Sequence, residues 1–334
     1  MSQNTKKWYN PVITHITSEE NLIMKKILAA VVAMVVSFTA FAQETIYLWP
    51  QKVAPGSKNV KIEHEIDERS ANPEEHHDRA EMGITEPYMT LYKAENPNGA
   101  AILIAPGGAY QRVVYDVEGS DRAKLYCENG YTVFVLNYRL PGDGHDEGAY
   151  APLADAQRAI RIIRSKAGEY GIDPKKIGVM GSSAGGHLAS CLGTKYNEKI
   201  GTKVDEIDDV DARPDFIILC YPVITMSDEG THTGSRKVLL GEKPKKKAKL
   251  AFSTELLVTE KTPPSFIVLS QNDGSVKPFY NGVAFAQKLS EKKVPYELHI
   301  YQDGKHGFKT KDVHATCKDW QLASLNWLNA YIKK

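Results

Sequence analysis

The chain has 334 residues, and 42 Lys and Arg stand against 41 Asp and Glu, which gives a formal net charge of +1. A charge this balanced argues against a protein that binds nucleic acid or an anionic membrane through its overall charge. The one basic run, "KPKKKAK" at 243–249, is short and has no interleaved aromatic residues. It is predicted to be a solvated surface loop.

The N-terminal part of the chain contains the pattern of an export signal. Two lysines precede an apolar run over 27–41, and "AFA" at 40–42 fits a signal-peptide cleavage site. The run is shorter than a comfortable membrane span, which makes a membrane anchor or a buried helix the weaker alternative. The sequence therefore predicts an upstream extension over 1–23, a signal peptide over 24–42 that starts at Met24, and one α/β domain over 43–334. The protein is expected to be periplasmic or secreted, without stable membrane insertion.

Short apolar runs bounded by turn residues predict a series of buried strands. They lie at 100–106, 131–138, 176–181, 215–221, 265–270 and 296–301, and helical patterns lie at 153–171, 284–293 and 320–334. Strands that alternate with helices predict an α/β fold, with a mainly parallel sheet covered by helices on both faces. The runs at 45–49 and 87–94 have no helix between them and predict an antiparallel pair at one edge.

The segment "IGVMGSSAGGHLAS" at 177–190 contains the one Gly-x-Ser-x-Gly pattern of the chain, centred on Ser183. A serine on a sharp strand-to-helix turn takes strained backbone angles, so the chain needs small residues two positions away on either side. Ser183 is therefore the predicted nucleophile, at the positive end of the following helix. Ser182 does not fit, because Met180 stands where its glycine should be. A glycine-rich turn with a capping serine is the plain structural alternative.

A serine hydroxyl needs a base to become a nucleophile, and in this type of fold an acid and then a histidine follow the serine. His306 lies in a turn directly after the strand at 296–301, and Asp273 directly follows the strand at 265–270. Asp273 is predicted to hold the imidazole in the right tautomer. The candidates that fit less well are His187, His232, His299, His314, Asp205, Asp208, Asp209, Asp211 and Asp303.

An attacked ester develops an oxyanion, which needs preorganised hydrogen-bond donors. Ala184, directly after the predicted nucleophile, offers its backbone N–H. The segment "APGGAY" at 105–110 follows the strand at 100–106 and offers the N–H groups of Gly108 and Ala109. Taken alone, its Pro-Gly-Gly would be an ordinary turn.

Together these motifs resemble a bacterial carbohydrate esterase of the α/β-hydrolase superfamily, in the group of acetyl xylan esterases and feruloyl esterases related to the hormone-sensitive lipase branch. The resemblance rests on "LWP…APG" (48–56), "APGGAY", "NYRLP" (137–141), "PLADAQRAIRIIRSKA" (152–167), "IGVMGSSAGGHLAS", "RPDFIILCYPVIT" (213–225), "TPPSFIVLSQND" (262–273) and "ELHIYQDGKHGF" (297–308). It implies Ser183 as nucleophile, His306 as base, Asp273 as its partner and the glycine loop as oxyanion hole, with no metal or other cofactor. Ala109 stands where relatives usually carry a third glycine, and Ser182 replaces a common aromatic residue.

The resemblance and the export signal together predict an esterase that removes acetyl, or else feruloyl, groups from plant-type polysaccharides or oligosaccharides. The expected partner is an acylated oligosaccharide, with no nucleic acid. A small-molecule esterase or formamidase, a serine peptidase and a non-catalytic binding protein on the same fold remain as alternatives. The acylated sugar and the oligomeric state are left open.

Four cysteines follow the predicted signal peptide. Cys191 and Cys220 lie in a predicted helix and strand and are expected to be buried small hydrophobes. The resemblance places the helices of Cys127 and Cys317 on the same face of the sheet, which makes them the one pair considered for a disulfide. Sequence does not give the separation of their Cα atoms, on which a bridge depends.

Overall fold

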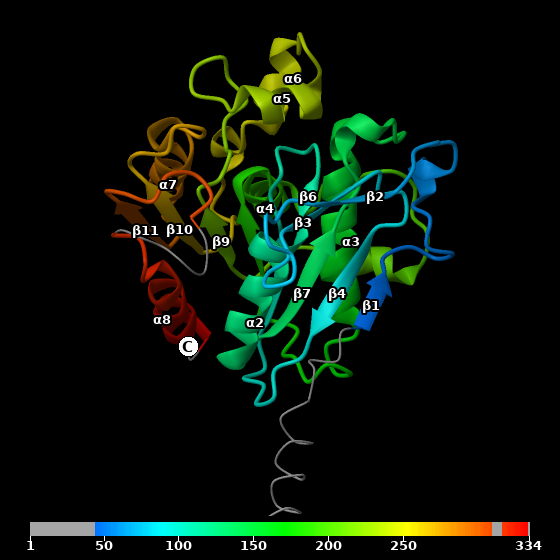
Figure 1. Ribbon diagram of the computed structural model, residues 1–334, viewed down its shortest axis with the longest axis horizontal. Helices are drawn as coiled ribbons and strands as arrows, with labels where there is room; N and C mark the ends of the chain where they lie inside the picture. Colours follow the sequence, from blue (N-terminus) through cyan, green and yellow to red (C-terminus); the bar gives the residue numbers. More distant parts are fainter. Residues whose placement is uncertain (1–43, 309–315, 333–334) are drawn as a thin grey trace, which may run out of the picture. The chain divides into compact units, whose positions relative to one another are not determined.

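One large sheet runs through the part of the chain that the structure, a computed structural model, describes: residues 44–308 and 316–332 (Figure 1). Its strands lie in the order β1-β4-β7-β5-β8-β9-β10-β11. In chain order they are β1 (Glu44–Tyr47), β4 (Tyr88–Tyr92), β5 (Ala101–Ala105), β7 (Thr132–Asn137), β8 (Ile177–Ser182), β9 (Ile217–Cys220), β10 (Ser265–Ser270) and β11 (Tyr296–Tyr301).

The directions of the strands match the predicted fold class. β1 pairs antiparallel with β4, and β4 pairs antiparallel with β7, whereas every other pair of neighbours in this sheet is parallel. The predicted antiparallel edge is therefore confirmed, and each predicted strand is present with ends that differ by at most two residues. The chain reverses its direction of travel across the sheet at β5, because β7 lies on one side of this strand and β8 on the other. Ligand sites of such sheets lie at the carboxyl ends of the strands around this switch point.

Helices cover both faces of the sheet (Figure 1). They are α2 (Asp121–Glu128), α3 (Ala151–Ser165), α4 (Ser183–Lys195), α7 (Gly282–Glu291) and α8 (Trp320–Ile332). The α2 helix connects β5 to β7, and α3 returns from β7 to β8, so right-handed crossovers place these two helices on opposite faces. α8 lies beside α2, where the Tyr126 and Ser324 hydroxyls are 2.7 Å apart. α4 lies beside α3, where Gln157 donates to the carbonyl of Lys195 at 3.0 Å.

The core explains why the central strands could be found in the sequence. Every residue of β5, β7, β8 and β10 is buried, so these strands are continuous apolar runs rather than alternating ones. The edge strand β11 is mostly half-buried or exposed. Burial of both faces therefore produces the strongest part of the sequence signal.

Several elements of the structure were not predicted. A small antiparallel sheet contains β2 (Glu65–Glu68), β3 (Arg79–Met82) and β6 (Val113–Val114), and two helices follow β9, namely α5 (Thr233–Leu240) and α6 (Lys246–Phe252). The shorter turns of helix are η1 (Pro55–Ser57), η2 (Asp116–Ser120), η3 (Pro141–Asp143), η4 (Gly148–Tyr150), η5 (Glu206–Asp209), η6 (Thr254–Leu257) and η7 (Pro278–Tyr280).

The prediction of a surface loop at 243–249 was wrong for its second half, which lies in α6. Lys and Ala are good helix formers, and the helix ends in the buried Phe252. The ring of Phe252 packs 4.9 Å from that of Tyr150. Phe252 belongs to the apolar core and Ala251 packs against it, so the end of the helix is anchored although its first residues are charged.

All four cysteines are buried and free, so the pair considered for a disulfide, Cys127 and Cys317, is not bridged. The Cys127 thiol donates to the carbonyl of Tyr92 at 3.4 Å. Cys191 and Cys220 are buried, as expected, and burial raises the pKa of Cys191 to about 12. A thiol held neutral in this way behaves as a small hydrophobe.

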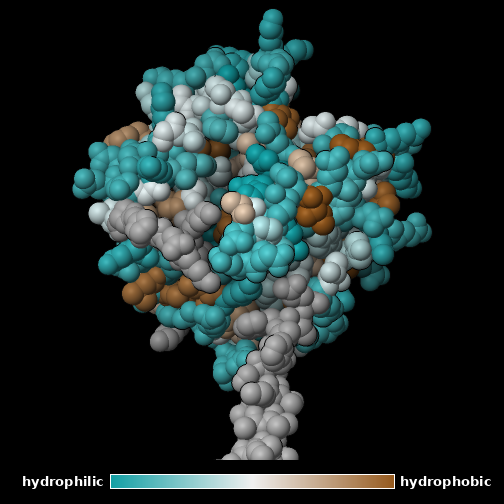
Figure 2. Space-filling model, viewed as in Figure 1, coloured by the Kyte–Doolittle hydropathy of each residue, from teal (hydrophilic) through white to brown (hydrophobic). Residues whose placement is uncertain are grey.

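The face shown in Figure 2 is mostly hydrophilic, and its apolar residues lie in small, separate patches. Over the described ranges, no helix is both long enough and apolar enough to cross a membrane. The predicted upstream extension and signal peptide lie outside the described residues.

Candidate active site

The predicted nucleophile lies at a left-handed backbone position. Ser183 begins α4 directly after β8 and has a φ of +52°, which is uncommon for any residue but glycine. The two glycines of the motif are required by close approach. A Cβ on Gly181 would lie 2.1 Å from the carbonyl oxygen of Gly185, and one on Gly185 would lie 2.1 Å from that of Ala105. The glycines at 181 and 185 are therefore needed because the backbone segments on either side of Ser183 lie in direct contact, with no space for a side chain.

The structure brings the predicted serine, histidine and aspartate into one hydrogen-bonded row. Ser183 Oγ lies 2.9 Å from His306 Nε2, and His306 Nδ1 lies 2.7 Å from Asp273 Oδ2. Because a carboxylate can only accept, Nδ1 carries the proton and Nε2 is free to accept from the serine hydroxyl. The second oxygen of Asp273 accepts from the backbone N–H groups of Ser275 and Val276, each at 2.8 Å. The carboxylate is thereby fixed in place, which is the geometry that general-base activation of a serine requires.

The loop that carries His306 is held by the loop that carries Asp273. Asn272 Oδ1 accepts from the N–H groups of Gly304 and Lys305, and its Nδ2 donates to Asp303 at 2.5 Å. Asp303 therefore helps to shape this turn, and His306 pairs with Asp273 instead. The ring of His306 packs edge-on against Tyr221, with centroids 5.0 Å apart.

The loop predicted to bind the oxyanion runs through three left-handed residues in succession. Gly108, Ala109 and Tyr110 have φ values of 131°, 57° and 62°. Successive N–H groups in a turn can form a concave anion-binding surface. Ala184 lies in the first turn of α4, next to Ser183. The three predicted donors thus lie on the loop and on the helix start that flank the nucleophile.

Gly107 is the residue of this loop that sequence reasoning missed. A Cβ on Gly107 would lie 3.0 Å from Ser183 Cβ and 2.8 Å from the carbonyl oxygen of Ser182. Its N–H does not face the nucleophile freely, because it donates to Glu118 Oε2 at 2.6 Å. The Pro-Gly-Gly signal was present in the sequence, but which glycine touches Ser183 depends on the packing of the loop.

His187 supports the same loop from below. Its Nε2 donates to the carbonyl of Phe252 at 2.7 Å, so its Nδ1 accepts from the Tyr110 hydroxyl at 2.8 Å. The Tyr138 hydroxyl holds the same loop by donating to the carbonyl of Pro106 at 2.7 Å. His187 is fully buried, and burial lowers its pKa to about 4. His187 therefore has a structural role, in which it holds Tyr110 by a hydrogen bond.

The remaining candidates have other contacts. His299 packs against Phe266, with ring centroids 5.0 Å apart, and His232 accepts from the N–H of Ser235 at the start of α5. Asp205 and Asp208 bind Arg158. His314 lies outside the described residues. In the described ranges, no group of three His, Cys, Asp or Glu side chains is placed to hold a metal ion.

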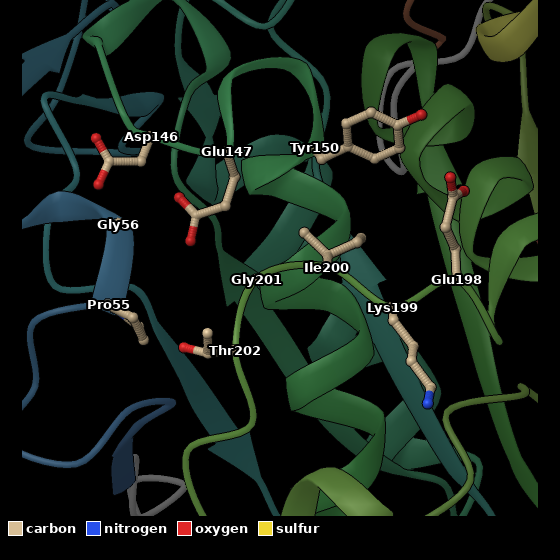
Figure 3. Close-up of a pocket in the computed structure, with 10 residues that line it drawn as sticks. All are labelled: Pro55, Gly56, Asp146, Glu147, Tyr150, Glu198, Lys199, Ile200, Gly201 and Thr202. Carbon is tan, nitrogen blue, oxygen red and sulfur yellow. The ribbon is translucent and has the colours of Figure 1, made fainter.

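The cavity in Figure 3 lies elsewhere in the molecule. It has a volume of about 570 Å³, and its lining includes Tyr150, Glu198 and Thr202 but neither Ser183 nor His306. Glu147 also lines it and binds the buried Arg139 at 2.9 Å. The cavity thus adjoins a structural ion pair rather than the serine–histidine row.

The chain is similar to proteins of a known family. The BD-FAE family model matches residues 89–289, more than half of the chain. The chain belongs to the BD-FAE family, and its sheet order, elbow and flanking helices are those of the α/β-hydrolase fold. The resemblance drawn from the sequence is therefore confirmed for family and fold.

Particular relatives narrow the comparison. The chain is 34% identical over 223 residues to an acetylxylan esterase of Xylanibacter ruminicola, which is 66% of this chain and 43% of that protein. It is 37% identical over 206 residues to endo-1,4-beta-xylanase B of Butyrivibrio fibrisolvens, 62% of this chain and 32% of that protein. The chain thus spans less than half the length of these curated relatives. An acetyl ester-xyloside bifunctional hydrolase from Caldicellulosiruptor lactoaceticus has a similar structure, with a TM-score of 0.70 at 33% identity, covering 86% of this chain and 96% of that one.

The buried His187 generates a prediction on acid stability. Its pKa is lower in the folded protein than in the unfolded chain, so between about pH 6.5 and pH 4 the unfolded chain binds an extra proton. The free energy of unfolding should therefore fall as the pH falls through this window. The His187→Gln variant has no titrating group at this position. Its free energy of unfolding should therefore fall less between pH 7 and pH 4.5 than that of the parent protein, by roughly 2–3 kcal/mol. Urea unfolding at both pH values measures the difference, and equal losses in the two proteins would contradict it.

Proposed function

We propose that the protein is a serine carboxylic ester hydrolase that removes acetyl groups from xylan-type polysaccharides or oligosaccharides. The observation that carries the proposal is the row Ser183–His306–Asp273 beside a loop of left-handed backbone. The acetylxylan esterase and the acetyl ester-xyloside hydrolase among the similar proteins support the choice of ester and sugar.

The first half-reaction forms an acyl-enzyme. His306 Nε2 takes the Ser183 hydroxyl proton as Oγ attacks the acetyl carbonyl, and Asp273 stabilises the resulting imidazolium. The N–H groups of Gly108, Ala109 and Ala184 are assigned to the oxyanion of the tetrahedral intermediate. The imidazolium then protonates the sugar oxygen, the ester bond breaks and the sugar leaves.

The second half-reaction returns the enzyme to its starting state. Water enters, and His306 takes a proton from it as it attacks the acetyl group on Ser183. The collapsing intermediate releases acetate, and the proton on His306 returns to Ser183 Oγ. Protons balance over the cycle, and no metal or other cofactor takes part in it.

Nucleophile identity is the first test. Ser183→Ala should lower kcat on acetylated xylo-oligosaccharides by a factor on the order of 10⁶, because the serine and its base act as a unit. Ser182→Ala should stay within roughly tenfold of the parent, since it only loses a hydrogen bond that stabilises the fold by about 1–3 kcal/mol. That bond comes from the buried guanidinium of Arg122 to the Ser182 hydroxyl. Acetate release followed by mass spectrometry makes the measurement, and equal activity of the two variants would refute the assignment of Ser183.

Acyl-chain length is the second test. The acyl group has to lie beside the loop 107–110, where Ala109 carries a methyl group that a glycine would lack. The value of kcat/KM should fall by roughly tenfold or more from the p-nitrophenyl ester of acetate to that of octanoate. Methyl ferulate serves as a separate substrate for the aromatic acid. A maximum at the eight-carbon ester would instead indicate a pocket for long acyl chains.

Export is the third part of the proposal and rests on the sequence pattern at 24–42. A gene that starts at Met24 should yield an exported protein whose first residue is Gln43, or pyroglutamate formed from it. Sequencing the N-terminus of the exported protein tests this. Retention of residues 1–23 on that protein would contradict the proposed start and cleavage site.

A further inference from the structure

A carboxylate lies beside the proposed nucleophile and has no part in the mechanism above. A Cβ on Gly107 would lie 2.6 Å from Glu118 Oε2 and 3.0 Å from Ser183 Cβ, so both groups border the same small volume. Glu118 comes from η2, a single turn of π-helix, a feature that is frequent at functional sites. The turn fits tightly, because a Cβ on Gly119 would lie 2.7 Å from Val135 Cγ1.

Both oxygens of Glu118 are engaged. Oε2 accepts from the N–H of Gly107 at 2.6 Å, and Oε1 accepts from the Tyr221 hydroxyl at 2.9 Å. The first bond is charge-assisted and short, which places it among the strong hydrogen bonds of proteins. The bond fixes the Pro106–Gly107 peptide unit, just upstream of the three left-handed residues of the loop.

The same carboxylate connects to the other segments of the site. The Tyr221 hydroxyl accepts from Arg122 Nη2 at 2.5 Å, and Arg122 Nη1 donates to the hydroxyl of Ser182. The ring of Tyr221 contacts that of His306. Glu118, Tyr221 and Arg122 therefore tie the loop, the elbow and the base together from beneath, and we call these three residues the supporting network.

The charge of Glu118 is balanced inside this network. A lone negative charge beside a developing oxyanion would oppose the reaction. Arg122 is 1% exposed, and its guanidinium lies 5.7 Å from the ring centroid of Tyr221 and 5.4 Å from that of Trp320. A buried guanidinium needs a compensating charge, which Glu118 supplies through Tyr221.

We propose that Glu118 is a positioning residue for the oxyanion-binding loop, which it holds by accepting from the N–H of Gly107. The inference rests on the proposed esterase activity. Glu118 acts on the loop by hydrogen bonding, so glutamine, whose amide oxygen can also accept from Gly107, should preserve most of the activity, whereas alanine should not. Because glutamine no longer balances the charge of Arg122, the glutamine variant should still lose thermal stability.

The experiment compares Glu118→Gln and Glu118→Ala with the parent on p-nitrophenyl acetate. Glu118→Ala should lower kcat by a factor on the order of 10², similar to the loss of one oxyanion donor, with a smaller change in KM. Its affinity for a trifluoromethyl ketone, which places an oxyanion in the hole, should fall by a similar factor. Glu118→Gln should retain at least roughly a tenth of the parent activity and analogue affinity.

A matched control separates positioning from stability. Glu147, like Glu118, is half-buried, and it accepts a hydrogen bond from the buried Arg139 at 2.9 Å. It lines the cavity of Figure 3, whose lining does not include Ser183. Glu147→Ala should lose thermal stability and keep its affinity for the trifluoromethyl ketone. The Tyr221→Phe variant loses the hydroxyl and keeps the ring against His306. Its kcat and its affinity for the trifluoromethyl ketone should lie between those of the two Glu118 variants.

Each outcome decides the inference. Unchanged kcat and analogue affinity in a folded Glu118→Ala would overturn it, as would a glutamine variant as impaired as alanine, which would assign the effect to charge. A rise in KM on xylo-oligosaccharides alone would overturn it too, by making Glu118 a sugar contact. Absence of ester hydrolysis by the parent would instead refute the proposed function, so the two failures are distinguishable.

Discussion

The site depends on one backbone constraint, the left-handed turn at Ser183. Such a conformation holds a side chain clear of the sheet, but it costs on the order of 1–3 kcal/mol for a residue other than glycine. It is possible here because Gly181 and Gly185 let the strand, the helix and the end of β5 approach within contact distance. The close approach also brings Gly107 against Ser183. The position of the loop 107–110, which is predicted to bind the oxyanion, is therefore a consequence of the same turn.

Strained backbone is concentrated around this turn. Of the eight non-glycine residues with positive φ in the described ranges, five border the site: Ala109, Tyr110, Ser183, Tyr221 and Lys305. Strain persists only where the surroundings fix the chain, and here they do so with hydrogen bonds from neighbouring side chains. Tyr110 is held by His187, Tyr221 by Glu118 and Lys305 by Asn272. The polar core beneath the site thus stabilises geometry that the local chain disfavours.

The sequence predicted what depends on local pattern. The buried strands were found because apolar runs between turns are a local signal. Ser183 was found from the glycine spacing around it, and Asp273 and His306 were found because each lies in a turn that follows a strand. β2 was missed because all of its residues are exposed and it shows no apolar pattern. The supporting network was missed for a different reason. Arg122 reaches Tyr221 across 99 positions of the chain, and no motif marks a contact that only the folded sheet creates.

His187 and His306 make the same kinds of hydrogen bond but lie in different environments, which give them different roles. Each donates from one ring nitrogen to an oxygen and accepts a hydrogen bond from a hydroxyl at the other. His187 donates to the neutral carbonyl of Phe252 and is fully buried, so a second proton would create an unbalanced charge, which its lowered pKa reflects. His306 donates to the carboxylate of Asp273, whose charge stabilises the imidazolium. The same hydrogen-bond pattern therefore fixes Tyr110 at His187, whereas at His306 the proposed mechanism uses it to take the proton of Ser183.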